Sequence, residues 1–107
     1  MIKYKIDIMK TLTDLGYTRQ RLREAKVMSQ ATLQNITDGW KLQTLTEEQI
    51  SRDPRLSARR EEGVNAITLE TLNKICIMCN LKIEDVVEIV PTDDEILKYY
   101  KVKVRHT

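Results

Sequence analysis

Apolar residues recur at helical spacing near the start of the chain, over residues 6–15. This spacing predicts a first helix there, and Gly16 follows where a helix would end. The opening residues also alternate with period two, so a short strand at residues 2–4 is an alternative for the start. The apolar positions of the predicted helix are Ile6, Met9, Leu12 and Leu15.

Two short helices are predicted next, over residues 18–39. Thr18 is a good N-cap for a helix that ends at Ala25, and Ser29 caps a third helix that Gly39 ends. Only three or four residues join the two helices, which is the arrangement of a helix-turn-helix. Their inward-facing positions are Leu22, Ala25, Leu33 and Ile36.

Residues 40–66 interrupt this regularity, and we interpret them as an insertion. Residues 46–49 fit a capping box, which predicts a short helix at about 46–52, and residues 57–62 favour another turn. The arginines of the insertion either extend a phosphate-binding surface or pair with the glutamates around them. These arginines are Arg52, Arg55, Arg59 and Arg60, and the glutamates are Glu47, Glu48, Glu61 and Glu62.

The second half of the chain predicts two more helices and a strand. Thr68 caps a helix with one apolar stripe, and residues 81–90 predict a short fifth helix. Period-two alternation over residues 98–105 predicts a strand that needs a partner. The partner is either residues 2–4 or, as favoured, the same tail of a second subunit, because residues 2–4 can pair with residues 88–90 instead. The stripe of the fourth helix consists of Leu69, Leu72, Ile75, Cys76 and Cys79.

Composition and charge narrow the class of protein. The chain is 41% hydrophobic and 32% charged, as in ordinary soluble proteins, and no segment approaches the ~20 apolar residues of a membrane span. The N-terminus lacks the continuous apolar run of a signal peptide, so a cytoplasmic protein without membrane contact is expected. The net charge of +2 is uneven: +4 over residues 1–41, −6 over residues 42–97 and +4 over residues 98–107.

The segment TRQRLREAKVMSQATLQNITDG resembles the Cro and repressor class of helix-turn-helix proteins, the Xre-like or lambda-repressor-like family. Residues 67–76 resemble the fourth helix of that family, and residues 85–91 the end of its fifth. The resemblance implies a mainly α, lambda-repressor-like bundle of about five helices, with the insertion between helices three and four. The DNA-binding domain would span residues 1–91, and the tail at 92–107 would form a dimerisation strand or part of a small terminal strand pair.

Three residues depart from the pattern of the family. Val27 stands where the turn commonly has Gly, so a turn without a left-handed residue is expected. Lys26 replaces a usual apolar residue. Asp38 places a negative charge where an Asn often contacts phosphate, which argues against that contact.

The resemblance also implies which side chains meet DNA. Gln30, Ala31 and Asn35 hold the base-facing positions: amide side chains can form two hydrogen bonds with adenine, and Ala can touch the thymine methyl group. Contacts to phosphate fix the register without reading sequence. The residues implied for these contacts are Arg19, Thr32, Gln34 and Lys41.

The expected function is that of a sequence-specific transcriptional regulator, prophage or bacterial repressor-like, which reads the major groove of double-stranded DNA with the helix Ser29–Asp38. A homodimer on two half-sites is expected from geometry. The alternative is an antitoxin or protein-interaction module that binds a partner protein and uses DNA binding for autoregulation. No cofactor, metal or enzymatic activity is expected, because Cys76 and Cys79 lack a second ligand pair and His106 is isolated at the far terminus.

Overall fold

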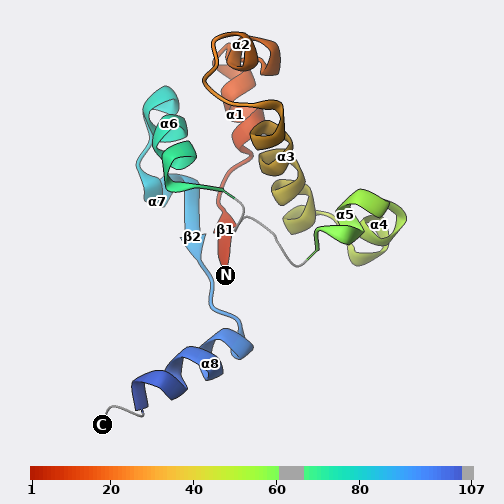
Figure 1. Ribbon diagram of the computed structural model, residues 1–107, viewed down its shortest axis with the longest axis vertical. Coiled ribbons are helices and arrows are strands. Elements are labelled where there is room, and N and C mark those ends of the chain that lie inside the picture. Colours follow the sequence, from red (N-terminus) through yellow and green to blue (C-terminus); the bar gives the residue numbers. More distant parts are fainter. Residues whose placement is uncertain (61–66, 105–107) are drawn as a thin grey trace.

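The structure is a computed structural model that describes residues 1–60 and 67–104, the last four of these for the backbone only. This part of the chain is mainly α, as predicted, with eight helices and one two-stranded sheet (Figure 1). Five helices remain once those of the insertion and the tail are set aside. The elements are β1 (Ile2–Tyr4), α1 (Ile8–Asp14), α2 (Arg19–Glu24), α3 (Gln30–Thr44), α4 (Glu47–Arg52), α5 (Pro54–Ala58), α6 (Leu69–Cys79), α7 (Ile83–Val86), β2 (Val87–Ile89) and α8 (Asp93–Val104).

The predicted starts of the second and third helices are confirmed, whereas the first helix begins at Ile8 and not at Ile6. The hydroxyl of Thr18 accepts a hydrogen bond from the backbone N–H of Arg21 at 3.2 Å, and the Ser29 hydroxyl accepts one from that of Thr32 at 3.2 Å. Each bond satisfies a donor that the first turn of a helix leaves unpaired. Gly16 follows α1 with a φ of +93°, a conformation that glycine adopts without strain.

The predicted end of the third helix at Gly39 is wrong. Helix α3 continues to Thr44, with Gly39 buried inside it. Beyond Gly39, the Gln43 side chain bonds both backbone groups of Tyr4: its Oε1 accepts from the Tyr4 N–H at 2.9 Å, and its Nε2 donates to the Tyr4 carbonyl at 2.5 Å. These contacts outweigh the cost of a helical glycine, which is about 1 kcal/mol. The insertion therefore begins near residue 45 and not at residue 40.

The two strands join the N-terminus to the end of the bundle. Strand β1 confirms the alternative start at residues 2–4, and it pairs antiparallel with β2, with Lys3 opposite Glu88. The prediction of a helix over residues 81–90 is wrong beyond Val86, because residues 87–89 pair with β1 instead. Residues 2–4 were expected to pair with residues 88–90, and they pair with residues 87–89, one residue earlier.

The insertion folds into two short helices beside the C-terminal end of α3 (Figure 1). The predicted capping box of α4 is present, formed by Thr46 and Gln49. Asp53 caps α5, so this helix begins earlier than the predicted turn at 57–62, of which residues 61–62 lie outside the described residues. Each of the two helices buries one apolar side chain, Ile50 in α4 and Leu56 in α5.

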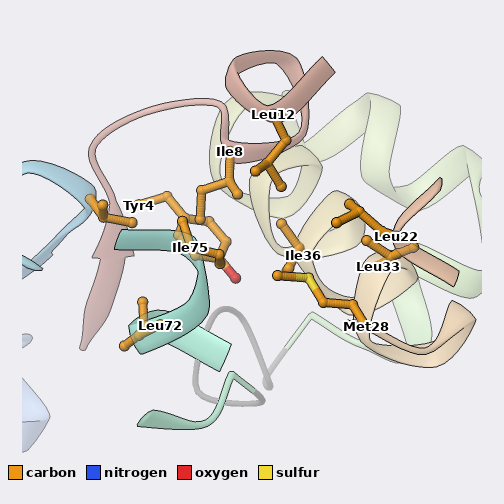
Figure 2. Packing of buried hydrophobic residues seen from close by; sticks show 10 residues of the cluster. Tyr4, Ile8, Leu12, Leu22, Met28, Leu33, Ile36, Leu72 and Ile75 are labelled. Atoms are coloured by element: carbon orange, nitrogen blue, oxygen red, sulfur yellow. The ribbon is translucent and has the colours of Figure 1, made fainter. Parts of the chain in front are cut away.

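The main core lies between α1, α2, α3 and α6 (Figure 2). Of the predicted stripe on α6, Leu72 and Ile75 are buried, and Cys76 and Cys79 are half-buried against the core. Leu69 was expected in this stripe but is 78% exposed, because it lies in the first turn and points away from the core. The buried cluster consists of Tyr4, Ile8, Leu12, Leu22, Met28, Leu33, Ile36, Leu72, Ile75 and Val86.

The predicted strand at residues 98–105 is wrong, because residues 93–104 form helix α8. Thr92 and Glu95 cap its start reciprocally: the Thr92 hydroxyl accepts from the Glu95 N–H, and the Glu95 carboxylate accepts from the Thr92 N–H, both at 3.1 Å. A helix satisfies its backbone groups internally, whereas a strand here would need a partner. The strand-mediated dimer expected from the tail loses its basis. Across the described ranges, no helix has the length and apolar character to cross a membrane.

Candidate nucleic-acid interface

The turn between α2 and α3 is held by backbone hydrogen bonds and by a left-handed residue. Lys26 has a φ of +57°, which corrects the expectation of a turn without such a residue. The left-handed position lies one residue before Val27, where the family pattern suggested a glycine. The Val27 N–H donates to the Leu22 carbonyl at 3.0 Å, and the Val27 carbonyl accepts from Lys74 Nζ at 3.0 Å. The turn is thereby fixed to both α2 and α6.

The first turn of α3 is the exposed end of this helix-turn-helix. Gln30 and Ala31 are exposed, while Leu33 and Ile36 on the opposite face are buried in the core. Ser29 is exposed before them and caps the helix. The structure therefore presents the side chains of Gln30 and Ala31 to solvent on a helix whose orientation is fixed by its buried face.

Asn35, the third residue expected to face bases, is occupied by the insertion. Its Oδ1 accepts a hydrogen bond from Nη2 of Arg59, the residue that follows α5. The Asn35 side chain is half-buried by this contact. Asn35 and Arg59 therefore form one polar unit, in which the Asn35 Oδ1 already accepts a hydrogen bond from the insertion.

Asp38 is the anchor of this unit. Its carboxylate is only 1% exposed, with Oδ2 2.5 Å from Nη1 of Arg59 and Oδ1 3.2 Å from Nη2 of Arg55. Gln34 Nε2 also donates to Asp38 Oδ1, at 2.8 Å. A buried carboxylate requires such partners, because an unpaired charge away from water is costly. Asp38 therefore joins α3 to Arg55 of α5 and to Arg59, the residue that follows α5.

The side chains expected to bind phosphate differ in how available they are. Lys41 is exposed on α3, and Arg19 is half-buried with Nη2 donating to the Thr37 hydroxyl. The Thr32 hydroxyl lies 3.0 Å from that of Ser29, within the cap. Gln34 is engaged with Asp38, as described above. Arg19 thus lies on α2, and the other three lie along α3, with Lys41 nearest its C-terminal end.

The arginines of the insertion pair with acidic side chains, which was one of the two expectations. Two of the four pair with an acid other than the expected glutamates. Arg52 pairs with Glu48, and Arg60 lies 3.3 Å from Glu47. Arg55 and Arg59 pair instead with Asp38 of α3. Glu61 and Glu62, the other expected partners, lie outside the described residues.

The two cysteines are thiols with a packing role in α6. Burial raises the pKa of Cys76, with further contributions from Asp85 and Glu84, and burial together with Cys76 raises that of Cys79. A raised pKa keeps a thiol protonated and therefore less reactive. Over the described ranges, no cluster of three or more His, Cys, Asp or Glu side chains is arranged to hold a metal ion.

The sequence reasoning missed the link between Asp38 and the insertion. Arg55 and Arg59 are four residues apart, the spacing that puts two side chains on one face of a helix, and this was the available signal. The acid that they would meet lies far away in sequence. Comparison of the chain with protein-family models, with curated proteins and with solved structures gives no match.

Proposed function

We propose that this protein is a sequence-specific DNA-binding regulator that inserts the first turn of α3 into the major groove, as expected of a lambda-repressor-like helix-turn-helix. The observation that carries the proposal is the exposure of Gln30 and Ala31 at the start of a helix that is held in place by the core and by a hydrogen-bonded turn. The major groove admits one α-helix, and residues near the N-terminus of that helix reach the base edges.

The charges around this helix support the same proposal. Arg21, Arg23 and Lys26 are exposed on α2 and the turn, and Lys41 is exposed further along α3. Basic side chains beside a reading helix neutralise phosphates and contribute the sequence-independent part of the affinity. The overall charge of +2 is small, so the local basic surface matters more than the total.

The insertion gives this interface a feature of its own. Because Arg59 holds Asn35, base reading by α3 depends chiefly on Gln30 and Ala31. Arg55 is half exposed at the same edge and adds a cation next to the reading helix. We propose that α5 extends the DNA-contacting surface of α3 toward its C-terminal half.

Selection of bound sequences from a random duplex library tests the proposal. We expect a short enriched motif and affinity for it that falls with salt. Lys41→Ala is expected to weaken binding to the selected and a scrambled duplex alike and to reduce the salt slope by about 1, as for one lost phosphate contact. Leu69→Ala, which changes an exposed side chain in the first turn of α6, is the matched control. Failure to enrich any motif, with no retention of duplex at low salt, would refute the proposed function.

A further inference from the structure

Helix α8 stands apart from the helices of the bundle (Figure 1). It is held to the sheet through the N-terminus: the Met1 ammonium lies 2.5 Å from Glu95 Oε1 and donates to the Val90 carbonyl at 3.0 Å. The Val90 N–H donates in turn to the Met1 carbonyl at 2.8 Å. The start of α8 is therefore fixed, while the rest of the helix extends away from the core.

The side chains of α8 and the adjoining strand form an exposed apolar face. Ile89 is 79% exposed, Leu97 65% and Tyr99 62%. Between α8 and the end of the sheet lies an open groove of about 580 Å³. Monomeric proteins rarely expose large contiguous apolar areas, and such areas mark interaction sites. The groove is lined by Met1, Ile89, Pro91, Ile96, Tyr99 and Tyr100, with Glu95 at its edge.

The charges of α8 indicate what covers this face. Its first turn contains Asp93, Asp94 and Glu95, whereas residues 98–104 contain three lysines and no acidic residue. In an antiparallel pair of such helices, the acidic end of each lies beside the basic end of the other. A parallel pair would place like charges together. The charges of α8 are thus complementary to those of a second α8 that runs in the opposite direction. A two-fold interface requires such self-complementarity.

We propose that two copies of this chain form a dimer through α8 and the groove, with the two α8 helices antiparallel about a two-fold axis. Ile96, Tyr99 and Tyr100 form the centre of the contact, and Ile89 extends it onto the sheet. The dimer does not depend on the proposed DNA contacts. It replaces the strand-mediated dimer with a helical one.

Sedimentation of the full chain over a series of concentrations tests the dimer. We expect the mass of two chains for the wild type and for Leu69→Glu, a control that charges another exposed apolar residue, outside this face. The double variant Ile96→Glu/Tyr99→Glu is expected to raise the dimer dissociation constant by at least about tenfold, as for loss of central interface residues. Both side chains are exposed in the single chain, so the helical circular dichroism is expected to stay unchanged.

A charge variant tests the orientation. Asp93→Lys/Asp94→Lys turns the attraction of an antiparallel pair into repulsion and is expected to weaken the dimer by at least about tenfold at low salt. In a parallel pair it would exchange one repulsion for another and change little. A wild-type chain that is monomeric at every concentration, or a dimer that survives Ile96→Glu/Tyr99→Glu, overturns the proposal. The first result would indicate that a different protein covers the apolar face. An unchanged dimer in Asp93→Lys/Asp94→Lys overturns the antiparallel arrangement.

Discussion

Removing both arginines that neutralise Asp38 is expected to destabilise the protein strongly. In the wild type, the buried carboxylate has Arg59 at 2.5 Å, Arg55 at 3.2 Å and the Gln34 amide at 2.8 Å. Arg59→Met alone leaves Arg55 and Gln34 in place. Arg55→Met/Arg59→Met leaves a charge that is 1% exposed with only an amide beside it.

The expected costs follow from the number of partners that remain. Arg59→Met removes the charged hydrogen bond to Asp38 and the one to Asn35. Each hydrogen bond of a charged group contributes about 1.5–3 kcal/mol, so a loss of at least that size is expected. An unpaired buried charge costs about 3–5 kcal/mol, which is the expectation for the double variant. Adding Asp38→Asn to the double variant removes the buried charge and is expected to restore part of the lost stability.

Urea unfolding followed by circular dichroism measures these differences. Arg52→Met is the matched control, because Arg52 and its partner Glu48 are both 74% exposed, and a change within about 0.5 kcal/mol is expected. The reasoning fails if the triple variant is less stable than Arg55→Met/Arg59→Met. In that case the carboxylate would contribute through its hydrogen bonds and shape, and its charge would not need the two arginines.

Three further predictions concern single side chains. Burial raises the pKa of Tyr4 from 10.0 to about 12, so the stability that the neutral side chain contributes is complete below pH 10 and is lost as the pH rises toward 12. The expected loss is about 2–3 kcal/mol, and unfolding at several pH values should show that it is absent in Tyr4→Phe. Lys26→Gly should raise the free energy of unfolding by up to about 1 kcal/mol, because glycine adopts the left-handed conformation of Lys26 without strain, and an unchanged or lower urea midpoint would contradict this. Cys76 and Cys79 should be alkylated more slowly in the folded chain than in urea, because burial raises the pKa of both thiols, and equal rates would disprove this.

Local signals in the sequence predicted most helix starts. Thr18, Ser29, Thr46 and Thr68 each precede a helix and bond to its first turn, as expected, because an N-cap depends on only a few neighbouring residues. Strand β1 was among the predicted alternatives because residues 2–4 alternate with period two, which is also a local signal. Residues 87–89 were predicted as part of a helix, and only their pairing with the N-terminal segment was weighed.

Features that depend on distant residues were not predictable in this way. Helix α3 passes Gly39 because Gln43 bonds to Tyr4, which is far away in sequence. The contact between Asn35 and Arg59 likewise requires the fold of the insertion. In α8, an alternating sequence became helical because the described chain offers its backbone no partner strand, whereas its first turn is well capped. The seven residues expected to contact DNA remain predictions.

The central claim is that Gln30 reads a base edge in the major groove. The most direct measurement is the ratio of the dissociation constants of Gln30→Ala on a selected and a scrambled duplex, compared with the same ratio for the wild type. We expect the variant to lose about 1–3 kcal/mol on the selected duplex, to bind the scrambled duplex unchanged and to unfold at the wild-type urea midpoint, because Gln30 is exposed and carries no charge. An unchanged ratio, or an equal loss on both duplexes, would contradict the account.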